Sequence, residues 1–329
     1  MSALLKKKVF SDYFPVPEYL RLSNSGIAIT DTEVKFLEFR HGRFSRFEKI
    51  SLPEGVVQSG FINAPEKLIA ILKDLALRYK LRYAYATLPE ERAYLFTTII
   101  DKVPEEGLRD SVAFIIEENV PVKLANSVFD FDVIEELKQS NQLKITVSVI
   151  SKKVVDFYLQ VFESAGITPV SFDIESQAIA RAIIPRGDKS TQLIVHLGEK
   201  KTGFYVVEDE VVQWTTTLPY SAQTNTTNSH LTDLRTELRK IFAFWTTRAE
   251  KPGFSERKIE KMLICGPGAL NGALVAEFTK ECPVTCSITD PLINVPEAKA
   301  HLQQNLSAEV LNYASAIGLV LPNKIKSYA

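Results

Sequence analysis

The sequence predicts an α/β protein made of two similar lobes that face a cleft. An apolar strand, a tight polar turn and an answering strand occur twice, and the second copy lies about 168 residues after the first (position 196 against position 28). The chain of 329 residues is long enough for two cores, and its 45% hydrophobic and 24% charged residues are typical of a globular protein. A net charge of −1 gives no electrostatic basis for binding nucleic acid.

The first copy of the repeat opens the first lobe. Periodicity predicts a strand-turn-strand segment over Gly26–Phe39, a strand over Phe47–Pro53, a helix over Pro65–Lys80 and a strand over Tyr83–Leu88. The next elements form a strand-helix-strand-strand subdomain inserted into this lobe. They are predicted over Arg92–Ile100, Pro104–Asn119, Ser127–Val133 and Leu143–Ile150.

The chain then returns to the first lobe and crosses to the second. The predicted returning elements are a helix over Lys152–Ala165, a strand over Thr168–Ile174 and a helix over Ser176–Ile183. The predicted second lobe holds the second copy over Leu193–Pro219, a polar loop over Ser221–His230, an amphipathic helix from Leu231, a strand over Lys258–Cys265 and a closing helix over Leu311–Leu319. The predicted divisions are residues 1–25 (an N-terminal extension), 26–90 with 151–185 (the first lobe), 91–150 (the inserted subdomain), 190–322 (the second lobe) and 323–329 (a C-terminal tail).

Two lobes with paired turns are the plan of the actin, hexokinase and Hsp70 superfamily. In that superfamily the backbone N–H groups of both turns grip the phosphates of ATP, and a carboxylate at each strand end holds the water around Mg²⁺. Here the two strand-end positions are Ala28 and His196, and neither is an acid. Asp31 could take a displaced role, but an aspartate in this place more often shapes a hairpin.

The nucleotide site expected from this plan is therefore degenerate. Its candidate residues are Thr30, Asp31, Thr32, Lys35, Gly198, Lys200, Gly266 and Gly268, with Lys201 as a further cation beside the second turn. Pro267 lacks the N–H that a nucleotide could use. We expect no catalytic residue and no obligatory cofactor, although binding of ATP and Mg²⁺ stays open.

Several phrases of the sequence, taken in order, resemble those of PilM, the actin-like protein of type IV pilus assembly and a relative of the cell-division protein FtsA. They are Ser51–Val56, Leu88–Glu91, Glu117–Pro121, Phe129–Phe131 and Ser164–Glu175. The resemblance implies a two-lobed actin-like (ribonuclease H-like) ATPase fold. Family members usually carry Asp at both strand ends, and they carry a further helical segment after the strand ending near Thr217, so here the fourth subdomain is expected to be reduced.

The resemblance implies a scaffold, a pseudo-ATPase, on the cytoplasmic face of the inner membrane. In the family, the groove between the first lobe and the inserted subdomain receives the cytoplasmic tail of the membrane protein PilN, and the complex contacts the pilus motor ATPases. On this chain the groove would be bounded by Phe96, Phe114 and Ile115. The sequence leaves open whether the protein forms a homo-oligomer.

Two further functions stay open at this stage. The first is an ATP-binding switch of a pilus, type II secretion or DNA-uptake apparatus, or an FtsA-like cell-division protein. The second is a sugar or acetate kinase, for which we find no catalytic Asp. No apolar run approaches the ~20 residues that span a bilayer, so an integral membrane protein is not expected. Three cysteines suit a reducing compartment, and the spacing of Cys282 and Cys286 predicts packing residues and no metal site.

Overall fold

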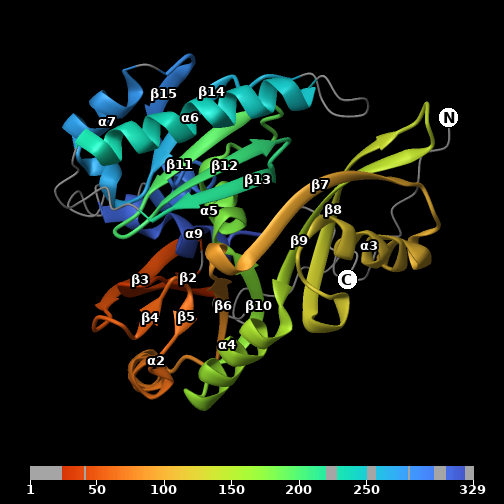
Figure 1. The fold of residues 1–329 in the computed structure, drawn as a ribbon. Helices are drawn as coiled ribbons and strands as arrows, with labels where there is room; N and C mark the ends of the chain where they lie inside the picture. The colour runs from red at the N-terminus through yellow and green to blue at the C-terminus, as the bar shows by residue number, and fades with distance from the viewer. Residues whose placement is uncertain are drawn as a thin grey trace.

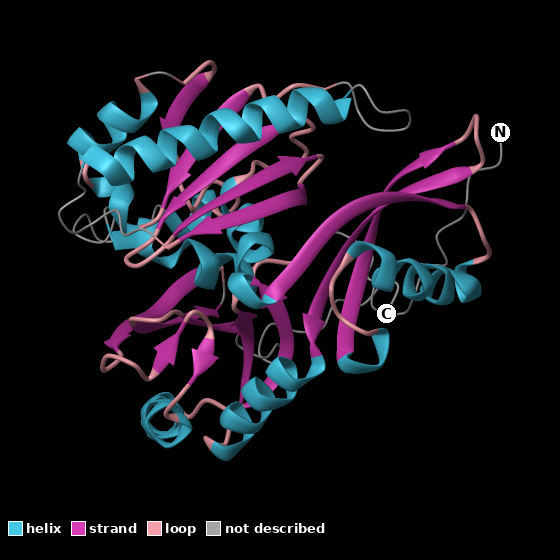
Figure 2. Cartoon of the chain, in the orientation of Figure 1, coloured by secondary structure: helices cyan, strands magenta, loops and turns pink. Residues whose placement is uncertain are grey.

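A computed structural model describes residues 24–40, 42–219, 228–249, 257–280, 282–299 and 309–322. It shows two α/β lobes stacked on each other and a third sheet beside them, with helices on the outer faces (Figures 1 and 2). The α/β architecture with an inserted strand-helix-strand-strand subdomain is confirmed. Most of the polar loop predicted over Ser221–His230 lies outside the described residues, as do the predicted C-terminal tail and most of the predicted N-terminal extension.

The first lobe is a mixed sheet in the order β10-β6-β1-β2-β3. Its strands are β1 (Asn24–Ile29), β2 (Glu33–Arg40), β3 (Arg43–Ser51), β6 (Tyr83–Leu88) and β10 (Thr168–Ile174). The helices α2 (Pro65–Tyr79) and α4 (Lys152–Ser164) pack on the sheet through residues at helical spacing, such as Leu68, Leu72 and Phe162. Burial of these apolar faces is the main source of the lobe's stability.

The second lobe repeats this arrangement. Its sheet has the order β13-β12-β11-β14-β15, with three antiparallel strands followed by two parallel ones, as in the first lobe. The strands are β11 (Gln192–Leu197), β12 (Thr202–Glu208), β13 (Val211–Leu218), β14 (Lys261–Cys265) and β15 (Thr285–Ile288). The helices α6 (Asn228–Ala249) and α7 (Gly272–Thr279) cover the outer face. The internal repeat read from the sequence is therefore a repeat of topology.

Two short helices cross where the lobes meet. They are α5 (Glu175–Ile183) and α9 (Ala314–Val320), and they share one core with strands of both sheets. A Cβ atom at Gly318 would overlap the carbonyl oxygen of Ala178, and a Cβ atom at Gly26 would lie 2.6 Å from the carbonyl oxygen of Ala316. These positions need glycine because the backbones approach too closely for any side chain.

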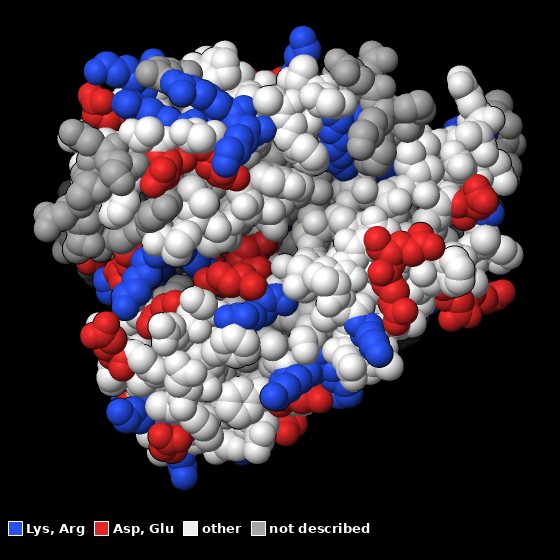
Figure 3. Space-filling model, viewed as in Figure 1, with Lys and Arg blue, Asp and Glu red and all other residues white. Residues whose placement is uncertain are grey.

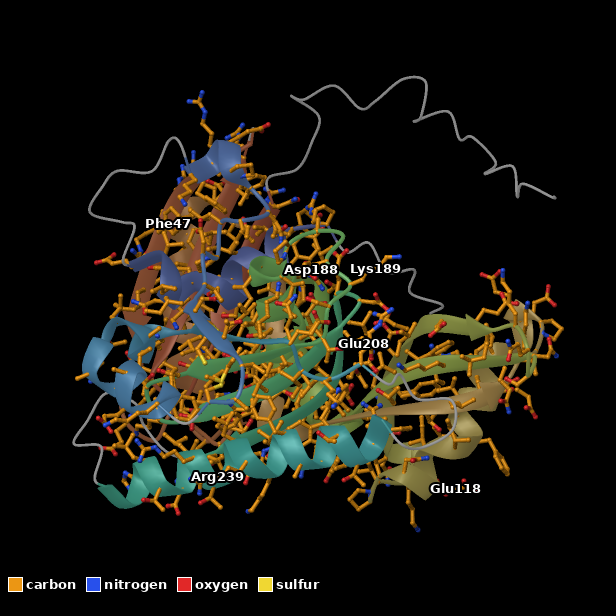
Figure 4. The ribbon with its side chains drawn as sticks, turned by 90° about the horizontal axis from the view of Figure 1, so that it is seen from above. Phe47, Glu118, Asp188, Lys189, Glu208 and Arg239 are labelled. Atoms are coloured by element: carbon orange, nitrogen blue, oxygen red, sulfur yellow. The ribbon has the colours of Figure 1, made fainter. Side chains whose placement is uncertain are left out.

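The inserted subdomain bridges the two lobes. Its sheet has the order β7-β9-β8, formed by β7 (Ala93–Asp101), β9 (Gln142–Ser151) and β8 (Ser127–Leu137), and α3 (Glu105–Asn119) packs on one face. On the side of the second lobe, Lys144 forms a buried ion pair with Glu208 at 3.3 Å, and the hydroxyl of Thr146 donates to the carbonyl of Val212 at 3.1 Å. Seen from above in Figure 4, Glu208 lies near the middle of the molecule, while Glu118 lies at the outer part of the subdomain. The subdomain is thus held by both lobes.

The structure differs from the predicted elements in several places. The strand β3 starts at Arg43 rather than Phe47, and β14 starts at Lys261 rather than Lys258. The predicted closing helix is a 3-10 turn, η6 (Glu309–Tyr313), followed by α9. The hairpin of β4 (Val57–Gln58) and β5 (Phe61–Ile62) was not predicted, because two-residue strands carry no periodic signal.

The close crossing of α5 and α9 predicts that Gly318→Ala destabilises the whole protein. The added methyl group forces the two backbones apart, so we expect a loss of at least about 2 kcal/mol in the free energy of unfolding. Urea unfolding followed by circular dichroism measures it. Gly272→Ala is the control, because a Cβ atom there meets nothing within 4 Å. Equal stability of the two variants would contradict the prediction.

Candidate functional site

The two predicted turns meet in the cleft. Residues of the β1–β2 turn and of the β11–β12 turn line one small cavity, and six of the eight candidate nucleotide residues are among them: Thr30, Asp31, Thr32, Lys35, Gly198 and Lys200. Of the other two, Gly266 touches the ring of His196, because a Cβ atom there would lie 2.6 Å from its Cδ2. Gly268 sits in the adjoining 3-10 turn η4 (Pro267–Leu270). The fold thus gathers the degenerate site at one place, and its chemistry follows from the groups present.

No acid stands at either strand end of the cleft. Ala28 is buried on β1, and His196 is 6% exposed on β11, where it pairs with Gly203 and Cys265 of the neighbouring strands. Burial lowers the pKa of His196 to about 4, so the imidazole is neutral at neutral pH. A neutral imidazole and a methyl group cannot orient the hydrated Mg²⁺ of a nucleotide complex.

The polar groups of the first turn are already hydrogen-bonded within the chain. The Thr30 N–H donates to the Glu33 carbonyl at 2.9 Å, and the Thr30 hydroxyl accepts from the Glu33 N–H at 3.2 Å. The carboxylate of Asp31 accepts from the N–H groups of Ser59 and Gly60 at 2.7 and 3.2 Å. Asp31 therefore ties the turn to the β4–β5 hairpin, which is the structural role that turn aspartates often have.

The second turn and the glycine turn are also closed. The Gly198 N–H donates to the Lys201 carbonyl at 2.9 Å. At the glycine turn, the N–H groups of Ala269 and Asn271 donate to the carbonyls of Gly266 and Gly268, and Pro267 has no N–H. The N–H groups of Thr30, Thr32 and Gly198 are thus engaged within the chain, whereas those of Asp31, Glu199 and Lys200 form no hydrogen bond within the described residues.

The three lysines of the site already have anionic partners. Lys35 lies 2.7 Å from Glu33 with both side chains buried, and Lys200 lies 3.8 Å from the exposed Glu54. Lys201 crosses the cleft and contacts Glu91 at 2.9 Å and Glu175 at 2.7 Å.

The contacts of Lys201 keep its partners charged. Burial disfavours the carboxylate of Glu175, but the ammonium of Lys201 outweighs that effect and lowers the pKa of Glu175 to about 2. Burial likewise disfavours the ammonium of Lys201, and Glu175 and Glu91 together raise its pKa above the ordinary value. Glu175 and Lys201 are therefore both ionised and paired with each other at neutral pH.

The space left between the turns is small. The cavity that they line has a volume of about 30 Å³, which is room for one or two water molecules. Beside it a hollow of about 330 Å³ is lined by Asp31, Lys200 and Lys201 of the turns and by Glu90, Glu91 and the Thr215–Thr217 end of β13. Figure 3 shows charged side chains of both signs along this cleft. Within the described part of the chain, no group of three or more His, Cys, Asp or Glu side chains could hold a metal ion.

A second hollow lies between the first lobe and the inserted subdomain. We call it the edge-strand cavity; it has a volume of about 280 Å³. Its walls include Phe129, Asp130 and Asp132 of β8, Phe172, Asp173 and Ile174 of β10, and Gln177 and Arg181 of α5. Both β8 and β10 are the outermost strands of their sheets, so each presents a free edge among the described residues.

A wider groove of about 1010 Å³ lies between α4 and the start of β7. It is lined by Phe61, Tyr94, Phe157 and other residues of these elements. None of the three predicted partner-binding residues lines this groove or the edge-strand cavity. Phe96 and Ile115 pack on the core beneath α3, and Phe114 is 78% exposed on α3. The spacing of the aromatic residues could not show this, because it does not reveal which strands end a sheet.

Asp132 is the least compensated charge in the edge-strand cavity. Burial, followed by repulsion from Asp130, raises its pKa to about 7, and Arg181 offsets this only in part because it pairs with Asp173 at 2.7 Å. The cavity is therefore a place where an added cation would be favoured.

The raised pKa of Asp132 predicts a pH-dependent stability. The folded chain holds this proton up to about pH 7, whereas an unfolded aspartate loses it near pH 4, so stability falls as the pH rises between those values. From pH 5 to 8 we expect the wild type to lose about 1 kcal/mol more than Asp132→Asn, less than the full shift implies because the carboxylate keeps some water contact. Urea unfolding measures it, with the exposed Asp110→Asn as the control. Parallel curves for all three proteins would contradict the prediction.

None of the helices in the described ranges is both long and apolar enough to cross a lipid bilayer. No curated protein has a significant sequence match to the chain. Among solved structures, a PilM–PilN type IV pilus biogenesis complex is similar with a TM-score of 0.75 and 19% identity, over 91% of this chain and 98% of that one. The ethanolamine utilization protein EutJ from Carboxydothermus hydrogenoformans is similar with a TM-score of 0.52 and 11% identity, over 93% of this chain and 90% of that one. These likenesses confirm the two-lobed actin-like fold that the sequence resemblance implied.

The sequence match agrees with the fold. The sequence pattern of the family described as type IV pilus assembly protein PilM matches residues 26–229, which include the first lobe, the inserted subdomain and the start of the second lobe. The chain therefore belongs to the PilM family of type IV pilus assembly proteins.

Proposed function

We propose that this protein is a cytoplasmic scaffold of the pilus inner-membrane platform, which holds the tail of a PilN-like membrane protein and does not hydrolyse ATP. One observation carries the proposal: a cavity opens between two free strand edges, while the nucleotide end of the cleft is filled by the chain's own ion pairs. The PilM–PilN complex that resembles this chain gives the partner class. The pilus motor ATPases are proposed as further partners, and a related secretion or DNA-uptake platform would use the same surface.

An extended peptide suits the edge-strand cavity. The free edges of β8 and β10 offer main-chain donors and acceptors, and strand addition uses such groups for affinity. Between them, Phe129, Phe172 and Ile174 provide apolar contacts for alternate side chains of the peptide.

The charge of the cavity also suits a membrane-protein tail. Cytoplasmic segments beside a membrane span are rich in Lys and Arg. Asp130 and Asp132 line the cavity, and in the described residues neither forms an ion pair that would satisfy it. A basic residue of the tail would therefore gain a favourable contact beside Asp132.

An ATP-driven switch is the alternative, and the geometry favours it less. A triphosphate needs space between the turns and unpaired cations, whereas the cavity between the turns is about 30 Å³, the adjoining hollow of about 330 Å³ lies to one side, and the lysines are paired. A kinase would also need a metal site, and the described cleft residues form no group of acids, histidines or cysteines that could hold a metal ion. The remaining ways for ATP to bind require the ion pairs across the cleft to open.

Calorimetric titration with ATP at millimolar concentration, with and without Mg²⁺, tests the loss of nucleotide binding. We expect no saturable heat and no rise in melting temperature, because the lysines of the cleft are already paired and neither strand end carries the acid that would orient Mg²⁺. A PilM protein that carries Asp at both strand ends is the positive control. Saturable binding by this chain would support the switch instead.

Tail binding is tested by a substitution on β8 that enters the edge-strand cavity and by a control substitution on the facing strand β10 that does not. Val128→Arg places a bulky cation in the edge-strand cavity from a residue that is 39% exposed, so we expect at least about a tenfold loss of affinity for the PilN-like tail peptide. Val170→Arg makes the same change on β10 at a residue that is 52% exposed and does not line the cavity. Fluorescence anisotropy measures the affinity and thermal melting measures the folding of both. If Tyr94→Arg abolishes binding and Val128→Arg does not, the tail occupies the wider groove.

A further inference from the structure

We propose that Lys201 is a positioning residue that holds the cleft closed without nucleotide and thereby sets the width of the edge-strand cavity. Lys201 together with Glu91 and Glu175 is called the Lys201 triad. Closure of the cleft by Lys201 does not depend on the proposed tail binding, whereas the effect on the edge-strand cavity rests on it.

The members of the triad come from three parts of the chain. Lys201 lies at the end of the β11–β12 turn in the second lobe. Glu91 lies in the 3-10 turn η2 (Glu90–Arg92), where the chain leaves the first lobe for the inserted subdomain. Glu175 is the first residue of α5 and directly follows β10. One ammonium group therefore joins the second lobe to the segment that leaves the first lobe for the subdomain and to the start of α5, which leads from the first lobe to the second.

The triad is strong because it is shielded from water. The side chains of Lys201, Glu91 and Glu175 are 17%, 18% and 5% exposed, and both contacts are short, at 2.9 and 2.7 Å. Charge-assisted contacts in a partly dry site are much stronger than surface ion pairs. Removing the ammonium would leave two carboxylates facing each other without a cation, so the segments that carry them would separate.

A neighbouring contact strengthens the same junction. The carboxylate of Glu90 accepts from the N–H of Ser176 at 2.9 Å, which joins η2 to the first turn of α5. The end of β6, the end of β10 and the start of α5 also line the edge-strand cavity, through Leu88, Ile174 and Gln177. The segments that the triad holds together are thus the segments that form one end of the cavity.

In nucleotide-binding proteins of this fold class, phosphates and their cation bridge the two lobes. Here a lysine and two carboxylates of the chain take that position; a cavity of about 30 Å³ remains between the turns, and the hollow of about 330 Å³ lies beside it. Closure is therefore encoded in the sequence and does not depend on the ATP concentration. The cavity for the tail is preformed, which lowers the ordering cost of binding.

The experiment compares Lys201→Met with Lys200→Met in the full chain. Methionine keeps the length of the side chain and removes its charge, and Lys200 is the matched control because it is 53% exposed with only a 3.8 Å contact to Glu54. Hydrogen exchange of residues 88–95 and 174–178 reports on the triad, and anisotropy with the PilN-like tail peptide reports on the cavity. For Lys201→Met we expect exchange at least about tenfold faster in both segments and an affinity at least about fivefold weaker, with the control like the wild type.

The outcomes separate the two parts of the proposal. Unchanged exchange in Lys201→Met would overturn the closure by the triad. Faster exchange with unchanged affinity would overturn the link to the cavity. If the wild type does not bind the peptide, the proposed function fails and the exchange data alone decide the closure. If Lys201→Met does not fold, Glu91→Gln is used instead, since it removes one carboxylate and keeps the 2.7 Å contact with Glu175.

Discussion

The close contact of α5 with α9 is the constraint on which the rest of the structure depends. The backbones touch at Gly318 and Ala178, and α9 touches β1 at Gly26, so the two sheets are fixed to one shared core. From this core β1 and β11 run to the cleft and place their turns opposite each other. The interior of a protein resists volume changes, so the position of both turns follows from these small residues.

The shared core at α5 and α9 explains how the cleft can lack the acids of a nucleotide site and still keep its shape. The cleft residues Ala28 and His196 are buried in intact strands, and the lysines beside the turns have found carboxylate partners within the chain. Ala28 packs in the core shared by the lobes, whereas His196 and the lysines belong to none of the hydrophobic cores. Under the proposed function, a fold whose two halves are joined by packing has exchanged a ligand-binding role at the cleft for a peptide-binding role at its side.

The sequence predicted the parts of the fold that have local signals. The strands over Tyr83–Leu88 and Thr168–Ile174 have the predicted bounds, and the repeat predicted two lobes with matching turns. The sequence also shows directly that positions 28 and 196 do not carry acids. The partners of Lys201 were not, because they lie more than 20 residues away along the chain and only the fold brings them together. Phe96 was expected to line a groove, but it packs on the core beneath α3. The spacing of residues along a strand does not show which face of the sheet a helix covers.

The buried pair of Lys144 and Glu208 limits how this sequence can change over evolution. Their side chains are 2% and 3% exposed, so losing Glu208 leaves the buried Lys144 ammonium without this partner, and losing Lys144 leaves Glu208 with only the 3.8 Å contact to Arg257. Replacing both by apolar residues of similar volume would cost little, but that exchange requires two mutations, and each intermediate is unstable. Selection therefore couples a residue of the inserted subdomain to a residue of the second lobe. Among descendants of this chain, the two positions are expected to covary although they are 64 residues apart.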